Sequence, residues 1–356
     1  MVSLDGIIFS LQKTGGVSVY FSELCRRIIR SNYNCEISVY QEMLLPNLRE
    51  CSDVVTRHIG RFAERYRRCV TSPSATLFHS SYYRLPQSNK IPAITTVHDF
   101  TYERFKSGPK RWVHSSQKYK AIREAAAVIC VSENTRKDLL EFMPDVPEEK
   151  VRVVYNGAGD CFFPLEIDSS IQSSNVLFVG SRFGYKNFEA AVNALALLSD
   201  VELICVGGGA FTVSEQLILE KFIPGRFRHE GLVSDARLNY LYNNAICLLY
   251  PSSYEGFGIP VIEAMRAGCP VVALNLSSIP EVSGDAAILL DAADPGLLAK
   301  AIEQLAEDDF RQEIRQKGLL QSSRFSWDTT FNQTIKVYEE VLGYALPRNT
   351  CIGSCI

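Results

Sequence analysis

The segment Tyr250–Val272, YPSSYEGFGIPVIEAMRAGCPVV, decides the fold class of this chain. It begins at the end of an apolar run, AICLLY, which predicts a buried strand, and Pro260 marks the first turn of a helix that ends at Gly268. A further apolar run follows at once. A strand, a glycine-containing loop, a helix and another strand in this order predict a parallel sheet covered by helices on both faces.

The same alternation extends over the whole chain, and Ser132 and Ser234 mark helix starts between the apolar runs. Strands are expected at Val2–Phe9, Glu36–Tyr40, Ala75–Phe78, Ala93–His98, Ala127–Val131, Val151–Asn156, Asn175–Val179, Val201–Val206, Ala245–Tyr250, Pro270–Ala273 and Ala286–Leu290. Because 356 residues exceed one ordinary domain, we predict an α/β protein of two doubly wound, Rossmann-like domains. A polar stretch over 157–174 predicts their connection, and ligands of such sheets bind in a cleft at the carboxyl ends of the strands.

The composition excludes several classes of protein. A hydrophobic share of 46% with 22% charged residues is that of a soluble globular chain rather than a disordered one. No run approaches the roughly 20 apolar residues of a membrane span, and no signal peptide is evident. The eleven cysteines include no Cys-x-x-Cys pair, which argues against zinc sites and disulfides and favours a reducing, cytosolic compartment.

Two carboxylates, Glu255 and Glu263, stand eight positions apart, one in the expected loop and one on the expected helix. Gly256 and Gly258 lie between them and would expose backbone N–H groups at the start of that helix, where polar or anionic groups bind. Such a pair could hold separate hydroxyl-rich parts of one ligand. The alternative is that Glu263 only stabilises the helix dipole and that Glu255 is incidental.

The string Glu-Gly-Phe-Gly-Ile-Pro-Val-Ile-Glu-Ala-Met resembles the Glu-x7-Glu signature of retaining, nucleotide-sugar-dependent glycosyltransferases of family 4, which have the two-domain GT-B architecture. The resemblance implies that Glu255 contacts the donor sugar, that Glu263 contacts the ribose, and that the amides around Phe257 and Gly258 lie near sugar and phosphate. It also implies an acceptor-binding domain over 1–165 and a nucleotide-sugar domain over 166–325. A helix over 326–345 would cross back to the first domain, and 346–356 would be a disordered tail.

A second constellation, Gly180–Asn187 (GSRFGYKN), follows an expected strand directly. Arg182 and Lys186 could stabilise the negative charge that develops on a departing diphosphate, without a metal ion. The family uses an Arg and a Lys at this place for this purpose. The alternative is a solvated basic loop.

The resemblance assigns further residues of the site. His98, the last residue of an expected strand, would orient the donor sugar, and Asp99, which follows it, would support the acceptor. The remaining donor-binding residues are expected to be Gly15, Gly16, Gly207 and Leu232. The triplet at 207–209 does not complete a Gly-x-Gly-x-x-Gly fingerprint, so a dinucleotide site is not expected.

The net charge of −3 conceals a basic half, +6 over 1–165, and an acidic half, −9 over 166–356. Within the basic half, Arg57, Arg61, Arg65 and Arg68 recur at steps of four, four and three and predict a basic amphipathic helix over 57–70. Such a helix could bind an anionic membrane surface. The alternatives are a solvated helix packed on its domain and chance asymmetry of charge. Nucleic acid is not expected, since no binding module accompanies the arginines.

The opening stretch SLDGIIFSLQKTGGVSVYF also resembles bacterial enzymes of O-antigen and surface-polysaccharide assembly, several of which use GDP-mannose. The expected activity is metal-independent, cofactor-free and retaining transfer of a mannose-type hexose. The expected acceptor is a lipid-diphosphate-linked glycan at the cytoplasmic face of the cell membrane, with the enzyme bound peripherally there. The alternatives are a UDP-hexose donor with another acceptor, a nucleotide-sugar 2-epimerase and an inactive binding protein.

Overall fold

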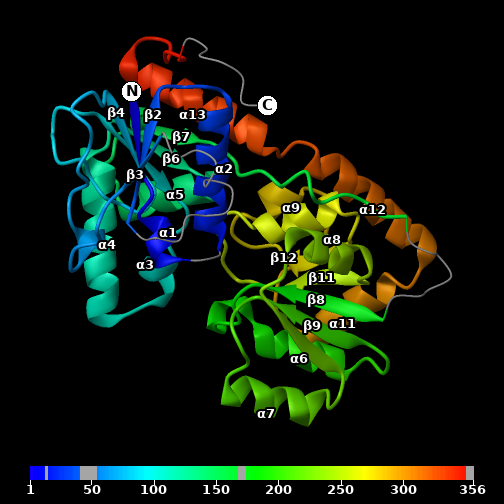
Figure 1. Cartoon of the computed structure of the whole chain (residues 1–356). Helices are drawn as coiled ribbons and strands as arrows, with labels where there is room; N and C mark the ends of the chain where they lie inside the picture. The colour runs from blue at the N-terminus through cyan, green and yellow to red at the C-terminus, as the bar shows by residue number, and fades with distance from the viewer. Residues whose placement is uncertain (13–14, 41–53, 167–173, 350–356) are drawn as a thin grey trace. The chain divides into compact units, whose positions relative to one another are not determined.

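The computed structural model describes residues 1–12, 15–40, 54–166 and 174–349 (Figure 1). These residues form two compact units: unit 1 is Met1–Asn156 with Trp327–Ile356, and unit 2 is Gly157–Ser326. Each unit has one parallel sheet with helices packed on it. The expected α/β class, with two Rossmann-like domains, is confirmed.

The sheet of unit 1 has seven parallel strands. In spatial order they are β3 (Val55–Arg57), β2 (Cys35–Val39), β1 (Val2–Asp5), β4 (Leu77–Ser80), β5 (Ala93–Val97), β6 (Ala127–Cys130) and β7 (Val151–Val153). The helices are α1 (Ile8–Leu11), α2 (Gly16–Arg30), α3 (Thr101–Phe105), α4 (Gly108–Glu124), α5 (Glu133–Phe142) and α13 (Trp327–Leu342), with 3-10 turns η3 (Glu64–Tyr66) and η4 (Glu148–Lys150). The four central strands β1, β4, β5 and β6 are buried along their whole length, as the apolar runs predicted.

The sheet of unit 2 has six parallel strands in the order of a dinucleotide-binding sheet. In space they are β10 (Phe227–Gly231), β9 (Glu202–Val206), β8 (Asn175–Val179), β11 (Cys247–Tyr250), β12 (Val271–Leu274) and β13 (Ile288–Leu290). The helices are α6 (Phe188–Ala196), α7 (Val213–Phe222), α8 (Asp235–Asn243), α9 (Ile259–Arg266), α10 (Ile279–Ser283), α11 (Pro295–Gln304) and α12 (Asp308–Ser322), with one 3-10 turn η5 (Gly184–Lys186). Within this unit, α6 and α11 cover one face of the sheet, while α8 and α9 cover the other (Figure 1).

Local signals place several helix ends correctly. The Ser132 hydroxyl accepts a hydrogen bond from the backbone N–H of Thr135 at the start of α5, and Ser234 caps α8 in the same way. Pro260 lies in the first turn of α9, and Gly268 follows its end in the left-handed region at φ 76°. These caps set where each helix begins or ends relative to the preceding loop.

The expected helix over 57–70 is wrong. Arg57 ends strand β3, and the only helical turn in the segment is η3. Partners distant in the sequence determine this backbone: the N–H of His58 donates to the carbonyl of Val39, and the N–H of Cys69 donates to that of Leu85. A helix would have to give up these bonds.

The four arginines expected on one helix face therefore diverge. Arg61 pairs with Glu64, and Arg68 pairs with Glu124 of α4. Arg65 lies over the rings of Tyr66 and Tyr82. Arg57 is exposed at the end of its strand. They do not form one basic stripe.

The division of the chain also differs from the expected junction at residue 165. Residues 157–165 pack on unit 2, where the N–H of Phe163 donates to Asn239 Oδ1 at 3.1 Å and Arg266 pairs with Asp160 at 2.5 Å. At the other end, Leu346 is buried and the N–H of Asn349 donates to the carbonyl of Asn32. The start of the expected tail is thus packed on unit 1, and the rest of it, 350–356, lies outside the described residues.

Candidate functional site

The order of strands in unit 2 identifies the edge at which a ligand would bind. The chain leaves β8 toward β9 on one side and returns to β11 on the other, so the loops after β8 and β11 diverge from adjacent strand ends. In open parallel sheets this divergence leaves a crevice at the carboxyl edge, where ligands bind. The stretches 180–187 and 251–258, which contain Arg182, Lys186 and Glu255, are these two loops.

Lys186 and Glu255 form an ion pair that joins the two loops. Lys186 is buried at the end of η5, and the rings of Tyr185 and Tyr250 have centroids 5.4 and 5.2 Å from its Nζ. Because these rings limit the access of water, the charges act more strongly on a bound group than they would at the surface. A cation beside a carboxylate can hold a ligand that carries both an anionic group and hydroxyl groups.

Asn187 fastens the two loops together directly after Lys186. Its side-chain N–H₂ donates to the carbonyl of Pro251 at 2.8 Å and to Ser253 Oγ at 2.7 Å. Asn187 has a φ of 52°, in the left-handed region that asparagine tolerates better than most residues. Asn187 was not predicted to have a role, although an Asn between a loop and a helix start is a recognisable signal.

Two serines hold the loop that carries Glu255. Ser277 Oγ donates to the carbonyl of Glu255 at 2.5 Å, and Ser278 Oγ donates to the carbonyls of Glu255 and Phe257, each at 3.0 Å. These serines lie about twenty residues further along the chain, so no local motif could have identified them. They determine the position of the Glu255 backbone.

Glu263 lies on α9, and its Oε2 accepts a hydrogen bond from the Tyr242 hydroxyl at 3.3 Å. Burial, with a smaller contribution from Asp235, raises the pKa of Glu263 to about 8. The carboxyl group is therefore mostly protonated at neutral pH and can donate a hydrogen bond as well as accept one. Gly258 caps this helix at φ 101°, a backbone conformation that favours glycine.

Arg182 is directed toward the glycine triplet rather than toward Lys186. Its Nη1 donates to the carbonyl of Gly207 at 3.2 Å, and its Nη2 donates to those of Gly209 and Ala210 at 2.8 and 3.0 Å. Its Nε lies 3.1 Å from Glu215 Oε1. The guanidinium is buried, and Glu215 balances part of its charge.

The glycine triplet over 207–209 packs closely against this arginine. A Cβ on Gly208 would lie 2.4 Å from the carbonyl oxygen of Gly180 and 2.9 Å from Arg182 Nη1. Thr212 and Glu215 form a capping box at the start of α7, a motif visible in the sequence, although nothing local revealed that Glu215 also pairs with Arg182.

The remaining predicted residues of unit 2 differ in exposure. Leu232 follows β10 and is exposed, so its backbone is accessible to a ligand. Phe257 is buried with its ring edge-on to Phe325, so its side chain is not accessible to a ligand. The structure thus brings Lys186 and Glu255 together, and Arg182 and Gly207 together.

In unit 1, α2 begins at Gly16, with Gly15 as its N-cap residue. The Ser18 hydroxyl donates to the Gly15 carbonyl at 2.9 Å, while the first N–H groups of this 15-residue helix point toward its N-terminus. One turn later, the ring of Tyr20 meets His98 edge-on, with centroids 5.1 Å apart. The helix start and the end of β5 therefore lie close together, as expected for parts of one binding surface.

His98 and Asp99 follow β5, at the carboxyl edge of the sheet. Burial lowers the pKa of His98 to about 4, although the adjacent Asp99 opposes the shift, so the imidazole is neutral at pH 7. One Asp99 carboxylate oxygen accepts the N–H of Thr101 at 3.0 Å, at the start of α3.

A fully buried lysine supports this strand end. Lys118 Nζ donates to the Asp99 carbonyl at 2.5 Å and to Glu103 Oε2 at 3.1 Å, and lies 3.6 Å from the centroid of the Phe100 ring. Burial lowers the pKa of Lys118, with Glu103 opposing the shift. Lys118 was not predicted as a supporting residue, because its position in α4 does not indicate partners 15 to 19 residues earlier in the chain.

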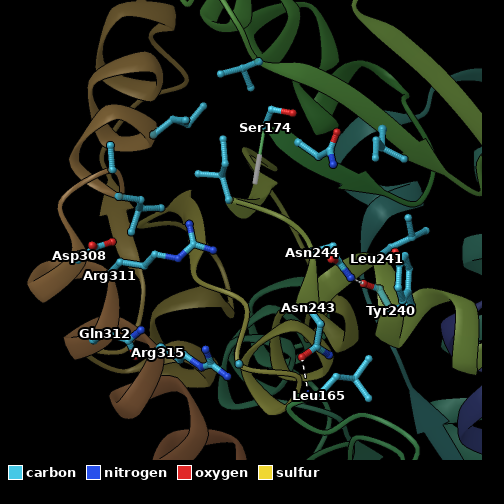
Figure 2. Close-up of a pocket in the computed structure, with 18 of the residues that line it drawn as sticks. Leu165, Ser174, Tyr240, Leu241, Asn243, Asn244, Asp308, Arg311, Gln312 and Arg315 are labelled. Carbon is cyan, nitrogen blue, oxygen red and sulfur yellow. Dashed lines mark hydrogen bonds between the residues drawn. The ribbon is translucent and has the colours of Figure 1, made fainter. Parts of the chain in front are cut away.

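A cavity of about 1300 Å³ lies elsewhere in unit 2 (Figure 2). Arg311 and Arg315 of α12 line one side, and Asn243 and Asn244 at the end of α8 line another. Asn175, the first residue of β8, is also in the lining, so the cavity lies at the amino ends of the strands. Since parallel sheets bind ligands at the opposite edge, and no predicted site residue lines this cavity, we do not place the site there.

The described residues contain no cluster of three or more His, Cys, Asp or Glu side chains placed to hold a metal ion. In the same residues, no helix combines the length and the apolar character needed to cross a membrane.

Two family models match the chain, one in each half. The model described as Glycosyltransferase Family 4 matches residues 14–158, and the model described as Glycosyl transferases group 1 matches residues 170–321. The matched ranges include every residue predicted for the site.

Among curated proteins, the chain is similar to the O-antigen chain mannosyltransferase B of Escherichia coli. The two are 30% identical over 285 residues, which are 74% of each chain.

Solved structures have the same fold. The chain aligns with a sucrose-phosphate synthase of Thermosynechococcus elongatus at a TM-score of 0.77 and 17% identity, covering 96% of this chain and 99% of that one. It also aligns with Anabaena HepE in complex with UDP-glucose at a TM-score of 0.72 and 16% identity, covering 95% and 99%.

Proposed function

Since this chain belongs to the family 4 glycosyltransferases of GT-B type, we propose that it transfers a hexose from a nucleotide-diphosphate sugar with retention of anomeric configuration. The observation that carries the proposal is the Lys186–Glu255 pair where the loops after β8 and β11 meet. The sugar is of the mannose type, which the similarity to an O-antigen mannosyltransferase supports. The acceptor is a lipid-diphosphate-linked glycan of bacterial surface polysaccharide.

The donor contacts follow from the chemistry of each side chain. Glu255 accepts hydrogen bonds from hydroxyls of the sugar, and Glu263 binds the ribose. Lys186 and the amides near Gly258 face the diphosphate, whose negative charge they stabilise. Arg182, whose charge Glu215 partly balances, supports the diphosphate together with Gly207.

In unit 1, the start of α2 at Gly15 and Gly16 binds near the diphosphate and the reacting hydroxyl. His98 orients the donor sugar as a neutral imidazole, which matches its lowered pKa. Asp99 positions the acceptor. None of these groups is assigned as a general base.

The reaction breaks the bond between the anomeric carbon and the diphosphate oxygen and forms a bond to the acceptor oxygen on the same face of the sugar. The acceptor proton passes to the leaving diphosphate. Lys186 stabilises the charge on the diphosphate, the role that a divalent metal has in other transferases. We therefore propose that the enzyme is metal-independent.

The proposed acceptor implies a location. A lipid-diphosphate-linked glycan is accessible only at a membrane surface, so the enzyme works in the cytoplasm, peripherally attached to the inner face of the cell membrane.

The test begins with the donor. We expect one nucleotide sugar from a panel of GDP, UDP, ADP and dTDP sugars to raise the melting temperature, because a ligand at a hundred times its Kd adds about 2.7 kcal/mol of stability. Glu255→Gln should abolish the shift, and Glu220→Gln, an exposed change on α7, should not. A chain that responds to no member of the panel would contradict the proposal.

The product then distinguishes the alternatives. We expect the α- or β-configuration of the donor to be retained in the glycoside, as NMR of the product would show, and activity to persist in EDTA. A UDP-hexose donor is the second candidate, because HepE, of the same fold, was solved with UDP-glucose. Release of free 2-epimerised sugar would instead indicate an epimerase, and binding without turnover would indicate an inactive binding protein.

A further inference from the structure

Two large apolar side chains of unit 1 extend almost completely into solvent. Ile59 is 93% exposed and Phe62 is 92% exposed, both in the irregular stretch between β3 and η3. Burial of such side chains is ordinarily favourable, and an exposed apolar pair on a soluble unit marks an interaction site.

The backbone that carries them is held in place. Arg84, fully buried, donates to Glu64 Oε1 at 2.7 Å and to Asp5 Oδ1 at 3.0 Å. Glu64 in turn accepts from Arg61 Nε at 2.7 Å. This chain of ion pairs ties the segment to β1, so Ile59 and Phe62 project from an ordered support.

A second exposed segment lies beside the first. All residues from Arg104 to Val113 are exposed, and among them Trp112 is 73% exposed at the start of α4. Gln117 of α4 donates to the carbonyl of Arg65 at 2.6 Å, and Arg68 pairs with Glu124 at the end of the same helix. The segment over 57–68 and α4 are therefore neighbours in unit 1 (Figure 1).

The two exposed segments are also rich in cations. Arg57, Lys110 and Arg111 are exposed and form no ion pair with any residue that the structure describes. Across the two segments, 57–68 and 104–113, nine Lys and Arg side chains stand against one acid, Glu64. Glu64 is engaged by Arg61 and Arg84, and carboxylates outside the two segments pair with Arg68 and Arg104. The unbalanced positive charge is therefore that of Arg57, Lys110 and Arg111.

We propose that these two segments form a docking surface for an anionic lipid bilayer, with Ile59, Phe62 and Trp112 inserted among the headgroups. Apolar and Trp side chains with adjacent Lys and Arg are the composition that binds at the bilayer interface. Each Lys or Arg near such a surface strengthens binding to the membrane, because anionic lipids give the surface a negative potential. This surface takes the place of the single basic helix expected from the sequence. The proposal rests on the proposed function in one respect: a lipid-linked acceptor explains why the enzyme would bind a membrane.

The two tryptophans of the chain give a direct test. Trp112 is exposed, whereas Trp327 is only 4% exposed in unit 1, so a change of environment at a bilayer would affect Trp112 alone. With vesicles of phosphatidylglycerol and phosphatidylcholine, we expect a blue shift of the emission and quenching by brominated acyl chains. Trp112→Phe should remove both signals while the protein still sediments with the vesicles. Unchanged emission from vesicle-bound wild type would overturn the proposal.

Variants separate the surface from the transferase activity. Ile59→Ser/Phe62→Ser should lower the vesicle partition coefficient by about tenfold or more, because two inserted side chains are lost. The matched control is Val213→Ser/Leu217→Ser, two exposed apolar side chains of α7 in unit 2, which should leave partition unchanged. Equal partition of both variants would contradict the proposal.

Donor-dependent activity gives an independent readout. Transfer to a water-soluble acceptor analogue should be unchanged in Ile59→Ser/Phe62→Ser. If the wild-type protein does not bind vesicles but transfers sugar, only the proposed docking surface is contradicted. If it binds vesicles but turns over no nucleotide sugar, only the proposed function is wrong. Binding to RNA instead of vesicles would identify the surface as a nucleic-acid site and overturn the proposal.

Discussion

Lys186 and Glu255 come from loops that follow different strands, and their ion pair places a cation beside a carboxylate at the meeting point of those loops. If this cation stabilises the leaving diphosphate, its removal should act on turnover more than on folding. We expect Lys186→Met to reduce kcat by about a hundredfold or more, the usual effect of losing one group that stabilises transition-state charge. Lys221→Met, at an exposed position of α7, is the control. A kcat within a few-fold of wild type would show that Lys186 has no such role.

Glu263 makes the stability of unit 2 depend on pH. Burial raises its pKa from 4.5 to about 8, so between these values the folded chain keeps a proton that the unfolded chain has lost. The free energy of unfolding must then fall as pH rises through this window. In Glu263→Gln we expect a smaller loss of melting temperature between about pH 5 and about pH 9 than in wild type. Glu220→Gln, exposed on α7, should follow wild type; identical slopes for all three proteins would contradict the shift.

The charged groups proposed for the site were easier to predict from the sequence than the residues that hold them. Glu255 and Lys186 stand in glycine-containing loops next to apolar runs, a local pattern that predicted their position at strand ends. Ser277 and Ser278 were missed because they reach the Glu255 loop from about twenty residues away. Arg182 was located but not its engagement with Glu215, which depends on where α7 packs. Partners that come together only through tertiary packing produce no periodic pattern in the sequence.

At the scale of elements, α3 and α4 are tied together by the buried pair of Glu103 and Lys118. Removing one member leaves an uncompensated charge, which costs about 3–5 kcal/mol. We therefore expect Lys118→Met to lower the free energy of unfolding by that amount in urea titrations. Lys120→Met, two positions along α4 and exposed, should change it by less than about 0.5 kcal/mol.

The double variant Lys118→Met/Glu103→Leu tests the cause. It replaces the pair with apolar groups of similar size and should recover most of the lost stability. If the double variant is no more stable than Lys118→Met, the effect comes from the packing of Lys118 and not from an unpaired carboxylate.

Apolar runs predicted the central strands, because strands buried on both faces are mostly apolar. The edge strands β3 and β10 were missed: VTR is too short to form a pattern, and FRHEG is largely polar because one side of an edge strand meets solvent. The helix over 57–70 was predicted from arginine spacing alone. Arg84, from well outside that window, holds Glu64 and helps to determine the observed backbone.

At the scale of the molecule, unit 2 is one continuous segment whereas unit 1 needs both ends of the chain. In unit 1, α13 supplies the Tyr338 hydroxyl that bonds buried His79, and Trp327 that packs on Tyr20. We expect a fragment over 157–326 to fold alone with a cooperative thermal transition followed by circular dichroism. A fragment over 1–156 should aggregate unless a peptide over 327–349 is supplied. The reverse behaviour would contradict this assignment of α13.

The chain enters and leaves unit 2 at adjacent points, because Ala158 and Ser326 form a parallel β-bridge. Unit 2 is therefore built like an insertion whose two ends meet, an arrangement that tolerates exchange of the inserted part. A single contiguous piece of gene encodes the whole proposed donor half, and replacing it would disturb neither α13 nor the sheet on which that helix packs. Evolution or an engineer could thus change the sugar that is transferred by one recombination event, while the proposed acceptor half is inherited intact.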